Sequence, residues 1–296
     1  MYHDLLHFLP SYLTSSQISY RVTNNVITSQ VASMLIKGMW NATPPTTTPL
    51  NIQPSAIDSL EPTYPCPAAS RLYASYATGS TSPAWTAHLH AAKPLMAALD
   101  AISDIPSNAT PWHISLDHYY DNLSARQCHA KPLPCRTADP KRCITQAQAD
   151  TVYRLGQYEY SFIYRDSPLS LRAAKATFGV WLAELASHIR AAVAGSDTII
   201  YRHNVAHDGS VARLLSLLQV DHMVWVGMGG EVVFEIYRHK EHTNMHYIRI
   251  LWGGRVLRSS NPGLGTVEML RLETFLQYVD GMVGVGAMDV VGFCGL

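Results

Sequence analysis

Two different periods of apolar positions follow each other in the last third of the chain. Residues 198–205 form an apolar, strand-like run that begins Thr-Ile-Ile-Tyr. From Ser210 to Leu218 the apolar residues recur every three or four positions, which is the pattern of an amphipathic helix. The segment 206–209 between them therefore predicts a turn that joins the end of a strand to the start of a helix.

Further extended segments are predicted after this helix. The pattern indicates a strand at 231–238 and then a hairpin, with a Gly253-Gly254 turn between residues 247–252 and 255–258. The apolar, glycine-rich stretch 279–296 is expected to form a buried terminal strand region. Strands and helices in this order are typical of an α/β fold, in which helices flank a mixed sheet.

Helices and loops dominate the pattern in the first half of the chain. Residues 1–40 are expected to be helical or irregular, and a Pro/Thr-rich stretch after them marks an exposed loop. Helices are expected at 93–105, with Pro94 in the first turn, and at 145–155. A longer helix is expected to begin at Ser167-Pro168 and to end at Gly195.

Composition narrows the class of protein. The 296 residues include 22 basic and 22 acidic side chains, so the formal net charge is zero, and a nucleic-acid partner, which favours a basic surface, is not expected. Hydrophobic residues make up 47% of the chain, which is enough for a sizeable core. Because no apolar run reaches the length that crosses a bilayer, no membrane span is expected.

Cysteines and glycosylation sequons point to a secreted or vacuolar protein. Three Asn-x-Ser/Thr sequons begin at Asn41, Asn108 and Asn122, in contexts that resemble loops. Three of the five cysteines, at 128, 135 and 143, crowd one polar stretch, which is typical of a disulfide-stapled loop. The pairing stays open, and the first residues printed do not have the pattern of a signal peptide.

The turn after the strand at 198–205 carries His207 and Asp208. Unpaired backbone N–H groups at a helix start attract anions, so this position suits a phosphate group. A histidine can donate a hydrogen bond to a phosphate oxygen, and an aspartic acid can deliver a proton to a leaving oxygen. The pair is therefore the first candidate for chemistry in this sequence.

The pair and several spaced segments resemble the histidine acid phosphatases, in particular secreted fungal members. The matching segments are 19–30, which leads into a helix, 112–119 to 181–185, which is similar to an accessory lobe, and 223–235, which carries a Val-Val-Phe-Glu strand opening. The resemblance implies a histidine-phosphatase-like fold. It also implies an α/β core of residues 1–40 and 176–296, with a mainly helical lobe inserted at 41–175.

The resemblance also implies a reaction and roles for residues. The family hydrolyses phosphate monoesters through a phosphohistidine, with no cofactor, and the matching roles are proton donor for Asp208 and phosphate contact for His207. The nucleophile of the family lies in an Arg-His-Gly-x-Arg-x-Pro motif, and no Arg-His-Gly occurs here. Where many members have a phosphate-binding Arg before a Thr, this chain has Ile27 before Thr28.

These departures lead to two hypotheses for the function. In the first, the chain is a phosphatase-like protein, truncated or complete, with weak activity or none, because loss of a nucleophile costs several orders of magnitude in rate. In the second, it is a non-catalytic secreted pseudophosphatase that binds a ligand or a partner. The missing motif also ends a central strand in the family, so either residues 1–18 fill that place or neighbouring strands stay unpaired.

Three further candidates have structural alternatives. Arg21 is a candidate phosphate contact, and the alternative is a surface or salt-bridged arginine. His203 is a candidate for substrate binding, or for a surrogate nucleophile, and the alternative is a strand residue oriented by the sheet. The histidines at 239, 242 and 246 suggest a zinc-dependent hydrolase, but a solvated turn is favoured and no metal site is expected.

Overall fold

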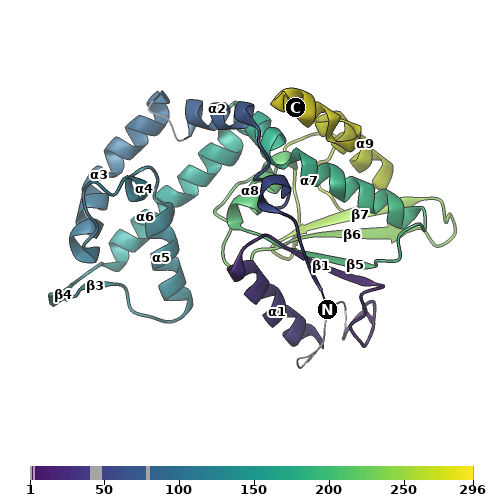
Figure 1. Cartoon of the computed structure of the whole chain (residues 1–296), viewed down its shortest axis with the longest axis horizontal. Helices are drawn as coiled ribbons and strands as arrows, with labels where there is room; N and C mark the ends of the chain where they lie inside the picture. The colour runs from purple at the N-terminus through teal and green to yellow at the C-terminus, as the bar shows by residue number, and fades with distance from the viewer. Residues whose placement is uncertain (1, 3, 41–48, 78–80, 296) are drawn as a thin grey trace. The chain divides into compact units, whose positions relative to one another are not determined.

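The computed structural model describes residues 2, 4–40, 49–77 and 81–295, and these form two compact units. An α/β unit comprises residues 1–68, 174–221 and 226–296, and a helical unit comprises residues 69–173 and 222–225. Helices and sheets together confirm the expected α/β class (Figure 1). The helical unit begins at residue 69, whereas the sequence placed the start of the inserted lobe at 41.

A three-stranded parallel sheet forms one part of the α/β unit. Its central strand is β1 (Ile18–Val22), which pairs with β2 (Leu50–Ile52) on one side and with β5 (Tyr201–Val205) on the other. In the register of β1 and β5, Val22 lies opposite Val205, so both strands end at the same edge of the sheet. Residues 1–40 were expected to be helical or irregular, which was wrong for residues 18–22, where β1 alternates buried and half-buried residues.

A four-stranded antiparallel sheet forms the other part. Strands β6 (Val232–Arg238) and β7 (His246–Trp252) pair over seven residues, and β8 (Arg255–Val256) and β9 (Leu270–Arg271) pair with β7. Gly253 and Gly254 both adopt positive φ angles in the turn between β7 and β8, a conformation that glycine reaches without strain. The predicted strand and hairpin are therefore confirmed.

Helices cover both faces of the parallel sheet. Figure 1 shows α1 (Val26–Trp40) and α7 (Ser170–Val193) on opposite sides of it, and α8 (Asp208–Leu217) follows β5. Tyr20 of β1 packs edge-on against Trp40 of α1 in a small hydrophobic core. A short helical turn, η1 (Ser55–Ile57), follows β2.

The end of the chain is helical, so the expectation of a terminal strand region at 279–296 was wrong. Helices α9 (Leu272–Val283) and α10 (Met288–Cys294) lie there, separated by the turn η3 (Val285–Ala287). Phe275, Val279 and Val283 recur every four residues and are all buried, which is the pattern of one helix face. Gly284 ends α9 at a φ of 75°.

The helical unit has its own core. Its helices are α2 (Pro67–Tyr76), α3 (Pro83–Ser103), α4 (Thr110–His113), α5 (Asp117–Cys128), α6 (Gln146–Ser161) and the π-helical turn η2 (Phe162–Asp166), with a hairpin of β3 (Cys135–Arg136) and β4 (Asp139–Cys143). Leu99, Leu116, Leu123 and Val152 are buried together. Within the described part of the chain, no helix combines the length and the apolar composition that crossing a bilayer requires.

Two predictions for helices in this region have different outcomes. The helix expected at 145–155 is confirmed as α6, which begins with a capping box between Thr145 and Gln148. Pro94 lies in the interior of α3 and not in the first turn of a helix, so that expectation was wrong. The true start of α3 is eleven residues earlier, where Ser82 caps the helix by accepting a hydrogen bond from the Trp85 amide.

Two disulfides are present. Cys135 and Cys143 join β3 and β4, which confirms the predicted stapled loop, and Cys128 is free and exposed. Cys66 pairs with Cys294 of α10 across a sequence separation of 228 residues. This second bridge connects the last helix to the segment in front of α2.

Strands β5 and β6 are both edge strands of their sheets. Among the strands that the structure describes, β5 pairs with β1 alone and β6 with β7 alone. Residues 4–17 form turns and bends, so this part of the chain does not supply a further strand. The Tyr2 hydroxyl donates a hydrogen bond of 2.6 Å to Oε1 of Glu235 on β6.

Candidate functional site

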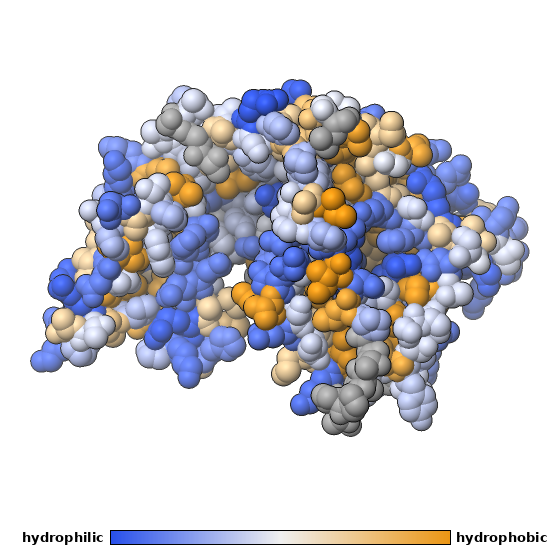
Figure 2. Space-filling model, viewed as in Figure 1, coloured by the Kyte–Doolittle hydropathy of each residue, from blue (hydrophilic) through white to orange (hydrophobic). Residues whose placement is uncertain are grey.

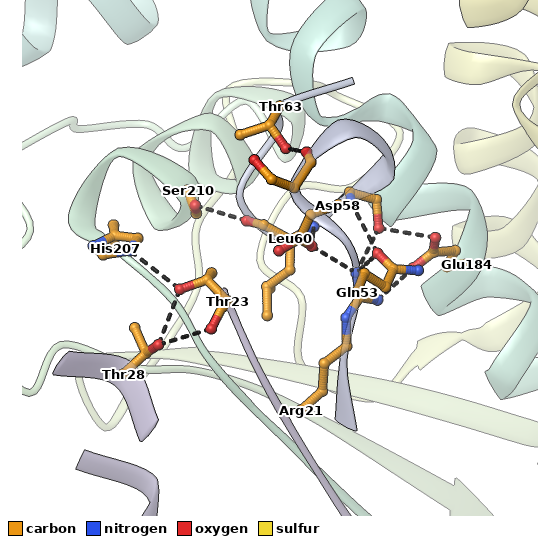
Figure 3. Close-up of polar contacts among 12 residues, drawn as sticks. Arg21, Thr23, Thr28, Gln53, Asp58, Leu60, Thr63, Glu184, His207 and Ser210 are labelled. Carbon is orange, nitrogen blue, oxygen red and sulfur yellow. Dashed lines mark hydrogen bonds and ion pairs between the residues drawn. The ribbon is translucent and has the colours of Figure 1, made fainter. Parts of the chain in front are cut away.

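His207 and Asp208 lie at the carboxyl edge of the parallel sheet, where β5 ends and α8 begins. Figure 3 shows His207 at this place. His207 is the N-cap residue, with extended backbone angles, and its carbonyl accepts hydrogen bonds from the amides of Ser210 and Val211. Asp208 is the first residue of α8, and its Oδ1 accepts a hydrogen bond of 2.7 Å from the Gly209 amide. The predicted strand-to-helix turn is therefore the place that carries this pair.

The His207 imidazole is held by groups from other elements. Its Nε2 lies 3.2 Å from Oγ1 of Thr23, at the end of β1, and 3.7 Å from Oε1 of Glu61. Thr23 and Thr28 are fully buried, and their hydroxyl oxygens are 3.0 Å apart. The His207 side chain is 34% exposed, so part of the ring faces solvent while Nε2 meets Thr23.

Glu61 reaches His207 because the segment that carries it is fixed at two points. The Leu60 carbonyl accepts a hydrogen bond of 2.8 Å from the buried Ser210 hydroxyl of α8. The Leu60 amide donates to Oδ1 of Asp58, a carboxylate that is 1% exposed. Glu61 was not predicted from the sequence, because no periodic pattern includes it. The one signal in the sequence is that Asp58 and Glu61 are the only charged residues between Lys37 and Arg71.

Arg21 of β1 is engaged by two carboxylates. Its guanidinium donates to Oε2 of Glu184 on α7 at 2.7 Å and to Oδ1 of Asp58 at 3.1 Å, and also to Ser59 and Gln53 (Figure 3). This is the salt-bridged arrangement that the sequence left as the alternative for Arg21. The cluster fixes the segment in front of Glu61, and the predicted phosphate contact of Arg21 stays a prediction.

His203 lies in the middle of β5, on the face of the sheet that α1 covers. Its Nδ1 is 2.7 Å from the Tyr201 hydroxyl, and its ring lies against the ring of Tyr20, with centroids 5.7 Å apart. Burial lowers the pKa of the His203 imidazole and so favours the neutral ring. These contacts belong to the packing of the sheet, whereas His207 and Asp208 lie beyond the end of the strand.

The surface next to His207 has an apolar part. Figure 2 shows hydrophobic residues over the start of α1, where Val26 and Ile27 are 70% and 61% exposed. Ile27 directly precedes Thr28, the buried residue that contacts Thr23. At this end of the sheet the His207 ring and the first turn of α8 are accompanied by the carboxylates of Glu61 and Asp208.

The other candidate residues lie apart from this site. Nδ1 of His239 accepts hydrogen bonds from the amides of Glu241 and His242, so these histidines belong to a turn, and the described residues contain no group of three or more potential metal ligands. Asn108 and Asn122 are exposed, but Asn122 lies within helix α5 and not in a loop. Asn41 lies outside the described residues.

Comparisons with known proteins identify a shared fold. No family model matches the sequence, and no curated protein matches it either. The chain is similar to the solved structure of a phytase from Klebsiella sp. ASR1, with a TM-score of 0.65 and 15% identity, over 98% of this chain and 82% of that one. It is also similar to a Hafnia alvei phytase in complex with myo-inositol hexakis sulphate, with a TM-score of 0.58 and 13% identity, over 95% and 82% of the two chains.

A phytase from D. castellii has the same fold, with a TM-score of 0.57 and 15% identity, over 96% of this chain and 62% of that one. The likeness extends over nearly all of this chain in each case. It confirms the fold that the resemblance to histidine acid phosphatases implied. Because the identities are low, it carries no role for any single residue.

Proposed function

We propose that this protein binds phosphate monoesters at the start of α8, with His207 as a phosphate contact and Asp208 in the position of a proton donor to the leaving oxygen. The observation that carries the proposal is the position of the pair at the carboxyl edge of a parallel sheet and at a helix N-terminus. Such positions bind anionic ligands in open α/β sheets. The fold shared with phytases supports the same class of ligand.

We also propose that this chain hydrolyses the bound ester slowly or not at all. In the implied reaction a histidine nitrogen attacks phosphorus, the leaving oxygen takes a proton, and water then cleaves the phosphohistidine. The sequence holds no Arg-His-Gly, and His203, the nearest histidine along the chain, is hydrogen-bonded inside the sheet. Without a nucleophile, proton donation by Asp208 has no bond cleavage to assist.

Binding and turnover are tested separately on the purified chain. Calorimetric titration with inorganic phosphate and with myo-inositol hexakis sulphate measures affinity, and release of p-nitrophenol from p-nitrophenyl phosphate at acidic pH measures turnover. We expect His207→Ala to abolish phosphate binding, and the exposed His222→Ala variant to leave it unchanged. Absence of binding in the unaltered chain would contradict the site.

The turnover assay distinguishes a weak enzyme from a binding protein. We expect release of p-nitrophenol close to the background rate, and no difference between the unaltered chain and Asp208→Asn. Clear activity that Asp208→Asn removes would show that the chain owns a nucleophile. Phosphate binding without turnover corresponds to the non-catalytic alternative.

We also propose that the protein is secreted or vacuolar. Two disulfides support maturation in an oxidising compartment, and the sequons at Asn108 and Asn122 are exposed. Mass spectrometry of glycopeptides from the protein expressed in a eukaryotic secretory host tests this. Unmodified asparagines at all three sequons, together with reduced cysteines, would contradict it.

A further inference from the structure

The hydroxyl group of Thr28 has one proton and three oxygen neighbours. Its Oγ1 lies 2.8 Å from the Asn25 carbonyl, 3.2 Å from the Thr23 carbonyl and 3.0 Å from Oγ1 of Thr23. A carbonyl oxygen can only accept, so the proton of Thr28 goes to a carbonyl. The contact with the Thr23 hydroxyl is then a hydrogen bond only if Thr23 donates to Thr28.

This assignment determines the next contact. The single proton of the Thr23 hydroxyl is used on Thr28, so Thr23 meets Nε2 of His207 with a lone pair. A hydrogen bond at 3.2 Å then requires a proton on Nε2. If Thr28 donated to Thr23 instead, Oγ1 of Thr28 and the Asn25 carbonyl oxygen would lie 2.8 Å apart with no proton between them. Since both threonines are buried, water cannot rescue that contact.

We infer that Thr23 and Thr28 act as positioning residues that hold the neutral His207 ring with its proton on Nε2, so that Nδ1 is the atom that meets a phosphate oxygen. Nδ1 has no hydrogen-bond partner among the described residues, while Nε2 faces Thr23 (Figure 3). A phosphate oxygen accepts hydrogen bonds, so it is met by the imidazolium form, in which Nδ1 gains a proton and Nε2 keeps its own. This step rests on the proposed function, whereas the proton position on Nε2 does not.

The two threonines come from separate elements, which explains how they set the ring orientation. Thr23 follows the last residue of β1, and Thr28 lies in the first turn of α1. Each hydroxyl is anchored through the next, and the last is anchored to the backbone carbonyl of Asn25. The hydrogen bonds of Thr23 and Thr28 therefore couple the His207 ring to the turn between β1 and α1.

The proton position is measured by long-range ¹H–¹⁵N NMR of the histidine rings at a pH above the usual titration range of histidine. The exposed His222 ring serves as the reference, because it reports the ratio of the two neutral forms in water. We expect the ratio of the Nε2–H form to the Nδ1–H form to be about tenfold higher for His207 than for His222, which corresponds to about 1.4 kcal/mol. A His207 ratio equal to the reference, or in favour of Nδ1–H, would overturn the inference.

Variants separate positioning from simple folding. Thr23→Val and Thr28→Val are expected to move the His207 ratio back towards the His222 reference, and Thr23→Ser is expected to retain the ratio of the unaltered chain because it keeps the hydroxyl. Thr151→Val, at a half-buried threonine of α6 whose hydroxyl donates to the Ala147 carbonyl, is the matched control. If Thr23→Val folds with an unchanged ratio, or if Thr23→Ser fails to retain it, the threonines do not position the ring.

Titration with inorganic phosphate tests the second half of the inference. We expect phosphate to perturb the Nδ1 resonance of His207 more than the Nε2 resonance. A larger effect on Nε2 would overturn the assignment of Nδ1 as the contact atom. If the ratio of the two forms is as expected but phosphate perturbs neither nitrogen, the proposed function fails while the positioning role stands.

Discussion

At the scale of single residues, the candidate site has few groups that attract an anion. The His207 ring and the first turn of α8 favour negative charge, whereas Glu61 and Asp208 oppose it. Arg21 is neutralised by Glu184 and Asp58 and so adds no free charge. The residue at the start of α1, where the family resemblance implied a cation, is the exposed Ile27.

Ile27→Arg is therefore expected to strengthen phosphate binding. The side chain is 61% exposed, so the added guanidinium acts in a solvated setting, where an ion pair contributes about 0.5–1 kcal/mol, or about two- to fivefold in affinity. Calorimetric titration with inorganic phosphate measures the change. Met34→Arg, on the same helix and also exposed, is the control, and an equal gain there would mean that Ile27 does not adjoin the site.

At the scale of elements, local signals were predictable from the sequence and tertiary contacts were not. The strand end and helix start around His207 are adjacent in sequence, so the two periods of apolar residues were sufficient to predict the turn. Glu61 reaches the same place only through the Arg21 cluster and the Ser210 hydroxyl, which no sequence period reports. β1 alternates over only five residues beside a longer helix, so its pattern was missed.

Pro94 shows how packing can override a local preference. A proline inside a helix removes one backbone hydrogen bond and costs about 3 kcal/mol, which argued for a helix start at that residue. The 21-residue α3 continues through it because Ala92 before it and Met96 and Leu99 after it are buried in one hydrophobic core. The burial of these side chains offsets the lost bond.

A buried contact between a histidine and a carboxyl group joins two helices of the helical unit. Nε2 of His88 on α3 lies 2.7 Å from Oε1 of Glu159 on α6, with side-chain exposures of 6% and 2%. The Leu116 amide also donates to Glu159. Burial raises the pKa of Glu159, although the hydrogen bonds from His88 and Leu116 act in the opposite direction.

His88→Ala is expected to destabilise the helical unit by about 1–3 kcal/mol, because it removes the His88 hydrogen bond from the buried Glu159 carboxyl group. Adding Glu159→Gln to this variant should restore part of the loss, since the amide carries no charge. Urea unfolding at neutral pH measures each variant. A double variant as unstable as the sum of the two single variants would show that the pair does not interact.

The pH dependence of the same pair has a definite sign. A carboxyl whose pKa is raised on folding binds its proton more tightly in the folded state, so its contribution to stability falls as the pH rises from the ordinary glutamate pKa towards the raised one. The unfolding free energy of the unaltered chain, minus that of Glu159→Gln, should decrease across this window. An increase over the same range would mean that the His88 contact outweighs burial.

At the scale of the whole molecule, the Cys66–Cys294 disulfide closes the longest loop. In the chain-entropy description, a bridge across 228 residues contributes up to about 5 kcal/mol, and one across 8 residues about 2.5 kcal/mol. The variant with serine at 66 and 294 should therefore lose more stability than the variant with serine at 135 and 143. Thermal unfolding measures both, with Cys128→Ser as the control, and a larger loss at 135 and 143 would contradict this order.

The open edge of β5 connects the architecture of the molecule to its candidate site, because the same strand ends at His207. The Tyr201 amide donates to the Gln17 carbonyl, so it points towards β1. Successive amides of a strand point to opposite sides, so those of His203 and Val205 also point towards β1. The amides of Arg202 and Asn204 point towards the open edge. Hydrogen exchange followed by NMR should therefore be fast at Arg202 and Asn204 and slow at His203 and Val205. It should also be slow along Tyr20–Val22, which lies between two strands. Slow exchange at all five β5 amides, together with a doubled mass in light scattering, would mean that a second copy covers this edge in solution.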